Sequence, residues 1–184
     1  MDKKELRKIL LKKRRSIPKE EKIIKDKKIT EKITALPCFE RAEQVLLFAS
    51  TEEEFDTRYL AEICKEKNKA VFYPRCLDKK GIMEFFRVNE ECELVMGKFN
   101  IKEPPLTNEK YIKKENDLII VPALSIDKRH YRIGYGGGYY DRFLKDFNGV
   151  SLCPCYSEMC TDRLPTNEYD IKVSIVATDK EVFL

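Results

Sequence analysis

A cluster of glycines is the most informative feature of the chain. Four of its seven glycines fall between positions 134 and 138, after an apolar segment and before a stretch that begins like a helix. A glycine-rich loop leading into a helix N-terminus presents backbone N–H groups and the positive end of the helix dipole, and phosphate is the anion it usually binds. Arg132 and Arg142 flank the loop, and Asp141 follows it as a candidate magnesium ligand. These residues predict a nucleotide phosphate site.

The loop departs from the two common nucleotide-binding patterns. A dinucleotide fingerprint would require glycine where Tyr139 stands, and a P-loop would require Gly-Lys-Ser/Thr after the correct gap. An NAD-type oxidoreductase is therefore an alternative that only detectable NADH binding would support.

The first 32 residues are strongly basic. The whole chain carries 36 Lys and Arg against 32 Asp and Glu, a net charge of +4, whereas residues 1–32 carry 14 against 6 and so a local charge of +8. This arm could contact nucleic acid or a membrane surface, line an anionic-ligand site, or form a solvated helix. A nucleic-acid-binding module without catalysis would use the arm and the nine tyrosines, but no RNA-recognition motif with interleaved aromatics occurs in a strand.

The cysteines and the single histidine limit the possible metal and nucleophile chemistry. The seven cysteines are scattered with no CxxC pair, which is most simply explained by reduced thiols. His130 is the only histidine, so a two-histidine metal site is excluded. Zinc held by His130 with Cys153, Cys155 and Cys160 is an alternative whose spacing matches no common zinc pattern. No apolar run approaches the roughly 20 residues of a membrane-spanning helix, and we expect a cytoplasmic protein.

The apolar pattern alternates between helices and strands. Helices are expected at 3–15, at 19–36 before Pro37, and at 57–67 with Thr57 as the cap; strands at 45–49, 70–73, 83–88, 118–121, 150–156 and 173–177; and a turn at 125–131. This alternation predicts an α/β fold: one three-layer α/β/α domain over residues 1–184 with a mostly parallel, Rossmann-like sheet. The basic helices of residues 1–36 would form an N-terminal helical arm packed on it. Ligands of such folds lie beyond the carboxyl ends of the strands.

Two long segments resemble the signature of a known family. Residues 117–127 read DLIIVPALSID and residues 132–142 read RIGYGGGYYDR, which together resemble the signature of the 5-formyltetrahydrofolate cyclo-ligase family, also called methenyltetrahydrofolate synthetase. KKELR at 3–7, ASTEEEFDT at 49–57 and LPTNEYDIKV at 164–173 are similar to further segments of the family, in the same order. One departure is Gly137, where many members carry lysine.

The resemblance implies a reaction that requires ATP and Mg²⁺. ATP would phosphorylate the formyl oxygen of 5-formyltetrahydrofolate, N10 would attack the activated carbon, and 5,10-methenyltetrahydrofolate, ADP and phosphate would result. Such chemistry depends on positioning and charge neutralisation more than on a protein nucleophile. The implied partners are ATP and the folate, with no nucleic acid and no membrane, and we expect a monomer.

The resemblance also assigns roles to individual residues. The catalytic set is Arg132, Tyr140 and Asp141, and the metal ligands are Asp141 and Asp170. The implied ATP-binding residues are Lys3, Lys4, Arg7, Arg132, Ile133, Gly134, Tyr135, Gly136, Gly137, Gly138, Tyr139 and Tyr140. The implied substrate-binding residues are Arg7, Ala49, Glu54, Arg75, Tyr135, Gly136, Gly137, Gly138 and Tyr139.

Some of these roles have open alternatives. Glu54 would accept hydrogen bonds from the pterin N–H groups, but Glu52 and Glu53 stand beside it. Arg75 could pair with a folate carboxylate or a phosphate, or be an ordinary surface arginine. Asp170 could equally be a surface carboxylate.

Overall fold

The structure, a computed structural model, describes residues 2–78, 81–90, 93–97 and 101–184. The helices are α1 (Lys3–Arg15), α2 (Lys19–Thr34), α3 (Pro37–Arg41), α4 (Arg58–Glu66), α5 (Tyr139–Lys145) and the 3₁₀ turn η3 (Ser157–Met159). The strands are β1 (Gln44–Leu46), β2 (Ala70–Cys76), β3 (Met83–Arg87), β4 (Val95–Met96), β5 (Lys102–Glu103), β6 (Leu118–Ile120), β7 (Ser125–Asp127), β8 (Arg132–Ile133), β9 (Val150–Pro154), β10 (Cys160–Thr161), β11 (Ile175–Ala177) and β12 (Val182–Phe183).

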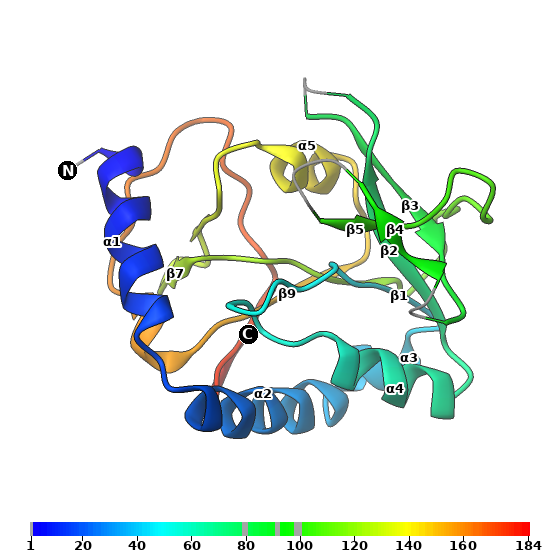
Figure 1. The fold of residues 1–184 in the computed structure, drawn as a ribbon, viewed down its shortest axis with the longest axis horizontal. Coiled ribbons are helices and arrows are strands. Elements are labelled where there is room, and N and C mark those ends of the chain that lie inside the picture. The colour runs from blue at the N-terminus through cyan, green and yellow to red at the C-terminus, as the bar shows by residue number, and fades with distance from the viewer. Residues whose placement is uncertain (1, 79–80, 91–92, 98–100) are drawn as a thin grey trace.

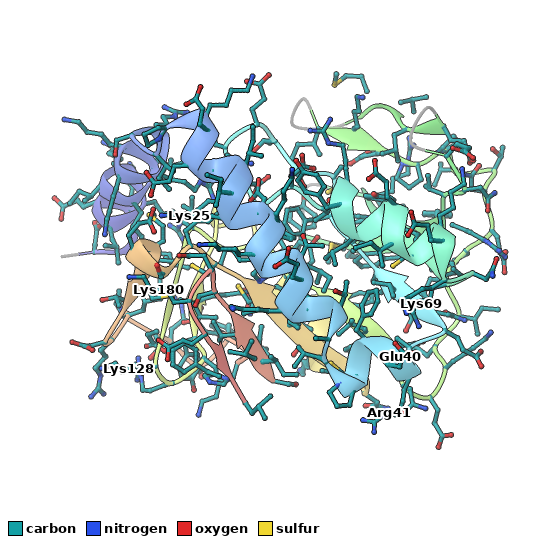
Figure 2. The ribbon with its side chains drawn as sticks, turned by 90° about the horizontal axis from the view of Figure 1, so that it is seen from below. Lys25, Glu40, Arg41, Lys69, Lys128 and Lys180 are labelled. Atoms are coloured by element: carbon teal, nitrogen blue, oxygen red, sulfur yellow. The ribbon has the colours of Figure 1, made fainter. Side chains whose placement is uncertain are left out.

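The predicted α/β fold with a mostly parallel sheet is confirmed. The main sheet has seven strands in the order β12-β11-β9-β6-β1-β2-β3. Its five inner strands pair in parallel, and the edge strands β3 and β12 are antiparallel to their neighbours. Figure 1 shows α2, α3 and α4 on one face of this sheet and α5 on the other. Seen from below, α2 crosses that face diagonally, with α4 beside it (Figure 2).

The core lies around the two central strands. Every residue of β6, and Val45 and Leu46 of β1, is fully buried. Their continuous apolar sequence is typical of parallel strands that are covered by helices on both faces. Among the described residues, no helix has the length and apolar character needed to span a membrane.

The start of two helices differs from the expectation. Residues 19–34 are helical, but Pro37 begins the short helix α3 instead of only ending α2, because proline suits the first turn, where no N–H bond is required. Thr57 does not cap α4 with its side chain. Its hydroxyl donates instead to the carbonyl of Phe48 at 2.7 Å, which ties the start of α4 to the segment that follows β1.

The segment expected as a turn at 125–131 is partly a strand. Residues Ser125–Asp127 form the buried strand β7, which pairs antiparallel with β8 and parallel with β10 in a small second sheet. Strands of two or three residues are too short to show a periodic pattern in the sequence. The hairpin of β7 and β8 leads directly into the glycine loop.

Candidate active site around the glycine loop

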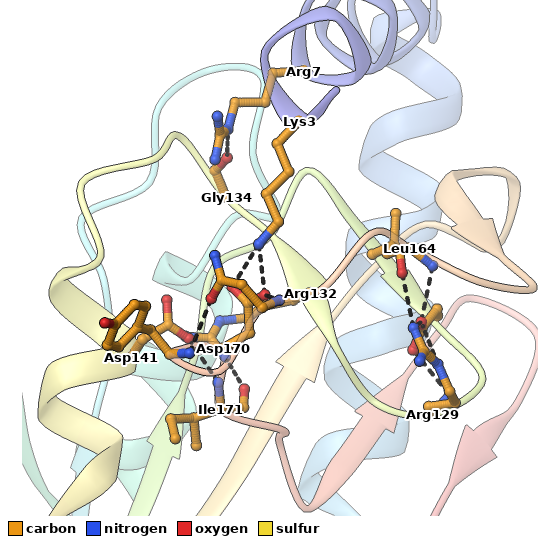
Figure 3. A network of polar contacts seen from close by, with 12 residues as sticks. Lys3, Arg7, Arg129, Arg132, Gly134, Asp141, Leu164, Asp170 and Ile171 are labelled. Atoms are coloured by element: carbon orange, nitrogen blue, oxygen red, sulfur yellow. Dashed lines mark hydrogen bonds and ion pairs between the residues drawn. The ribbon is translucent and has the colours of Figure 1, made fainter. Parts of the chain in front are cut away.

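One carboxylate fixes the hairpin that precedes the glycine loop. Asp127, whose side chain is fully buried, accepts hydrogen bonds from the backbone N–H groups of Arg129, Tyr131 and Leu164 and from the Arg129 guanidinium, at 2.7–3.0 Å. Burial alone would raise the pKa of Asp127, but these donors outweigh it and hold the pKa below its ordinary value. The turn is thereby anchored to the segment that carries Leu164 (Figure 3).

The N-terminal helix brings two predicted cations to the loop. Arg7 Nε donates to the Gly134 carbonyl at 2.8 Å, and Lys3 Nζ pairs with both oxygens of Asp170 at 2.5 and 2.8 Å (Figure 3). Gly136 has φ +101°, and a Cβ added there would lie 3.1 Å from Arg7 Cζ. Glycine is therefore required both by the backbone conformation and by the close approach of the guanidinium.

A third predicted cation, Arg132, lies in β8 just before the loop. Its Nη2 donates to Asp141 Oδ1 at 3.0 Å and its Nη1 to the Ile171 carbonyl at 2.7 Å. The N–H of Ile171 also donates to Asp141 Oδ1, at 3.1 Å. The side chain of Arg132 is only 5% exposed. These contacts join β8, the first turn of α5 and the segment after Asp170.

The two predicted metal ligands lie at this junction. Asp141 Oδ2 receives no hydrogen bond from a described residue, and Asp170 is the residue before Ile171, whose N–H bonds Asp141. Magnesium in nucleotide sites usually takes one or two protein carboxylates together with substrate phosphates. Asp141 fits this requirement, whereas both oxygens of Asp170 are bonded to Lys3 and its Oδ2 also accepts from the Asn167 N–H at 2.6 Å. No larger cluster of three or more His, Cys, Asp or Glu side chains exists in the described part of the chain, and the zinc alternative thus gains no support.

Glu54 lies in a buried position close to two tyrosines of the loop. It is 6% exposed, and its Oε2 accepts from both the N–H and the hydroxyl of Thr51, at 3.0 and 2.9 Å. Burial raises the pKa of Tyr135 and of Tyr140, and the negative charge of Glu54 adds to both shifts. Both hydroxyls therefore stay protonated at neutral pH and can donate hydrogen bonds.

Tyr140 has a hydroxyl without a partner. Its oxygen is buried and forms no hydrogen bond with any described residue. A buried polar atom of this kind is unfavourable for stability, and such atoms in native proteins often mark functional positions. The arrangement is consistent with a bound ligand accepting from this hydroxyl.

The remaining predicted site residues make none of the side-chain contacts described above. Arg75 Nη1 donates to the Pro104 carbonyl at 2.6 Å. It lines a cavity of about 320 Å³ with Cys76, Leu77, Gly97, Glu103 and Leu106. Lys4 is exposed on α1, Ala49 is half-buried against the core, and Ile133 is buried in β8.

The departure at Gly137 has a local structural consequence. A Cβ at this position would lie 2.7 Å from Cδ2 of Tyr139, and the Gly137 carbonyl accepts from Arg142 Nη1 at 2.9 Å. The Tyr139 ring thus occupies the space that any side chain at position 137 would enter. Among the described residues, Arg142 is a cation that reaches position 137.

The sequence-based analysis missed two residues of the site. Thr51 binds Glu54, and Arg14 binds the Tyr135 hydroxyl. Arg14 lies seven residues after Arg7, hence on the same face of α1, and this spacing was the available signal. The six described cysteines are free thiols, as expected.

Comparisons with known proteins agree with the resemblance. A profile described as the 5-formyltetrahydrofolate cyclo-ligase family matches residues 1–179. The 5-formyltetrahydrofolate cyclo-ligase of Escherichia coli K12 is 29% identical over 175 residues, 92% of this chain and 96% of that protein. The probable 5-formyltetrahydrofolate cyclo-ligase of Schizosaccharomyces pombe is 33% identical over 128 residues, 67% of this chain and 62% of that protein.

A solved structure shares the fold over nearly the full length. The 5,10-methenyltetrahydrofolate synthetase of Aquifex aeolicus superposes with a TM-score of 0.86 at 33% identity, covering 99% of this chain and 92% of that one. The profile match, the relatives and the shared fold agree with one another. The chain therefore belongs to the 5-formyltetrahydrofolate cyclo-ligase family, a family of enzymes.

Proposed function

We propose that this chain cyclises 5-formyltetrahydrofolate to 5,10-methenyltetrahydrofolate, with ATP and Mg²⁺, and releases ADP and phosphate. Family membership supports the reaction class. The observation that carries the proposal is the pair of arginines at the glycine loop: Arg7 bonds Gly134 from α1, and Arg132 bonds Asp141 in the helix that follows. We further propose a monomeric, cytoplasmic enzyme that acts on small molecules.

The ATP phosphates would lie on the loop between these cations. Backbone N–H groups of residues 134–138 would bind phosphate oxygens, while Lys3, Arg7 and Arg132 neutralise their charge. Asp141 and Asp170 would hold Mg²⁺, which supplies charge neutralisation on the transferring phosphoryl group. Lys3 and Arg132, which pair with these carboxylates, would exchange carboxylate for phosphate when ATP and Mg²⁺ bind.

The folate would bind with its pterin ring against Glu54. The buried carboxylate has one oxygen committed to Thr51, which leaves Oε1 to accept from the ring N–H groups. The Tyr140 hydroxyl would donate to the ligand near the reacting groups. Holding both substrates in this geometry supplies most of the catalysis in such a transfer.

The bond changes follow from this placement. The formyl oxygen attacks the γ-phosphorus, the bond to the leaving ADP breaks, and the formyl carbon becomes electrophilic. N10 then forms a bond to that carbon and loses its proton, and the C–O bond breaks as phosphate leaves. No protein nucleophile is required.

An absorbance assay tests the proposal. The protein is incubated with 5-formyltetrahydrofolate, ATP and Mg²⁺, and the near-ultraviolet absorbance of the methenyl product is followed against reactions without ATP and with excess chelator. We expect a rise that requires both ATP and Mg²⁺. Folded protein that gives no rise would refute the proposed activity.

A further inference from the structure

Arg14 is a buried cation on α1 with contacts to two other segments. It is 5% exposed. Its Nη1 donates to the Ala123 carbonyl at 3.1 Å, and its Nη2 donates to the Tyr135 hydroxyl. The guanidinium carbon also lies 5.7 Å from the centre of the Tyr135 ring. Arg14 thereby links α1, the connection between β6 and β7, and the glycine loop.

Stability alone does not explain a cation at this position. Removing a guanidinium from water is unfavourable unless its donors are satisfied, and Arg14 Nε is buried without a partner among the described residues. The Tyr135 residue that it binds is itself 55% exposed overall. A buried charge that holds an exposed ring in place is typical of a site in which the ring must meet a ligand.

The Tyr135 hydroxyl lies between this cation and the Glu54 region. Glu54 and burial raise the pKa of Tyr135, whereas Arg14 and a hydrogen bond with Thr51 act in the opposite direction. Thr51 in turn bonds Glu54 through its N–H and its hydroxyl. Arg14 is thus bonded to Tyr135 and Thr51 is bonded to Glu54, and the charge of Glu54 acts on the Tyr135 hydroxyl.

The position of Arg14 along α1 separates it from the nucleotide contacts. Lys3 and Arg7 face Asp170 and Gly134, and Arg14 lies about two helical turns beyond Arg7 on the same face. Figure 1 shows α1 at one end of the molecule, next to β7.

We propose that Arg14 is a positioning residue for the folate: it acts through the Tyr135 hydroxyl and sets the affinity for the reduced folate beside Glu54. This inference rests on the proposed function. The first half of α1 serves the nucleotide, and its last turn serves the folate.

Four variants test this role. Arg14→Met removes the cation, Arg14→Lys retains a charge with fewer donors, Tyr135→Phe removes only the hydroxyl, and Lys12→Met removes an exposed charge from the same turn of α1 as a control. We expect Arg14→Met to raise the KM for 5-formyltetrahydrofolate about tenfold, the usual effect of losing a hydrogen bond to a charged group. The KM for ATP should change by less than about twofold, because Lys3 and Arg7 remain.

The pairwise design separates positioning from general destabilisation. Tyr135→Phe should reproduce most of the folate effect, and the double variant should be no worse than Arg14→Met, because both remove one interaction. Arg14→Lys should recover part of the affinity, and Lys12→Met should match the wild type. Additive effects in the double variant, or equal changes in both KM values, would overturn the proposal.

A direct measurement of folate binding tests the role of Arg14 without requiring turnover. 5-Formyltetrahydrofolate is titrated without ATP, with tyrosine fluorescence as the signal. If the wild type binds folate but does not turn it over, the proposed activity fails, while weaker binding by Tyr135→Phe still supports the role of Arg14. Equal folate affinity in the wild type and Tyr135→Phe would overturn that role even if Arg14→Met does not fold.

Discussion

A single oxygen of Asp141 accepts from both the Arg132 guanidinium and the backbone of Ile171. Its other oxygen accepts from no described residue, and we propose that it binds Mg²⁺. We predict that Asp141→Asn lowers kcat by about 10²–10³, the usual effect of losing one charge-stabilising group. Since asparagine can still accept both hydrogen bonds, the free energy of unfolding should fall by only about 1 kcal/mol. Steady-state kinetics and urea denaturation measure the two quantities.

Asp146 provides the matched control for this substitution. It is an exposed aspartate just past the end of the same helix. Asp146→Asn should leave kcat unchanged. A variant Asp141→Asn with wild-type kcat would remove Asp141 from the proposed magnesium site.

A functional residue could be predicted from the sequence when the residues that act with it lie close to it in the chain. Arg132, the glycine loop and Asp141 all lie within the ten positions 132–141, so their shared role can be recognised in the sequence. Arg14 is different, because its partner Tyr135 lies 121 residues away. Its spacing of seven residues from Arg7 places it on the same face of α1, but no local feature tells what it binds or separates its role from that of the exposed Arg15, which pairs with Glu53 on the surface.

At the scale of an element, the β7–β8 hairpin depends on Asp127. Its carboxylate has a pKa below the ordinary value of about 4. Folding therefore gains stability from the ionised form; the gain is complete above the ordinary pKa and is lost as the pH falls through the lowered value. We predict that Asp127→Asn destabilises by about 2 kcal/mol at pH 7, with a smaller difference from wild type at pH 3.

Urea denaturation at the two pH values measures this difference. Asp162→Asn is the control, because Asp162 is exposed and pairs only with Lys128 at the surface. A gap between Asp127→Asn and the wild type that stays constant from pH 7 to pH 3 would contradict the role assigned to the ionised carboxylate.

The glycine loop gives a second prediction at this scale. Gly136 has a positive φ and is in contact with Arg7, whereas Gly134 has neither a positive φ nor any atom within 4 Å of an added Cβ. Gly136→Ala should destabilise by about 1–2 kcal/mol and raise the KM for ATP. Gly134→Ala should fold with nearly wild-type stability. Equal stability of the two variants in urea would contradict the backbone assignment.

Elements with a strong apolar pattern were predictable, and the shortest ones were not. The strand β6 is a continuous apolar run, and α1 has the expected bounds. The strand expected at 45–49 is present as β1, but it spans Gln44–Leu46. Strands β7, β8 and β10 have two or three residues each. These strands form because segments far apart in the chain pair with one another. A local sequence pattern carries no information about such pairing.

At the scale of the whole molecule, the site is assembled from both ends of the chain. Lys3 in the first helix pairs directly with Asp170, close to the end of the chain, and Arg7 of the same helix bonds Gly134 of the glycine loop (Figure 3). A ligand that binds all these parts must stabilise the fold as a unit. At 100 times its Kd, Mg-ATP should add about 2.7 kcal/mol, or roughly 5–10 °C in Tm for a chain of this size.

Thermal unfolding with matched ligands measures this linkage. Adenosine lacks the phosphates, so it should shift Tm much less than Mg-ATP at the same concentration. A shift by adenosine as large as that by Mg-ATP would contradict a phosphate site at the glycine loop.

The central claim is that the formyl oxygen of the folate becomes phosphorylated. The most direct measurement labels that oxygen with ¹⁸O and analyses the phosphate released during turnover by mass spectrometry. We expect one ¹⁸O atom in each phosphate formed. Methenyl product accompanied by unlabelled phosphate, with the label released into water, would contradict it.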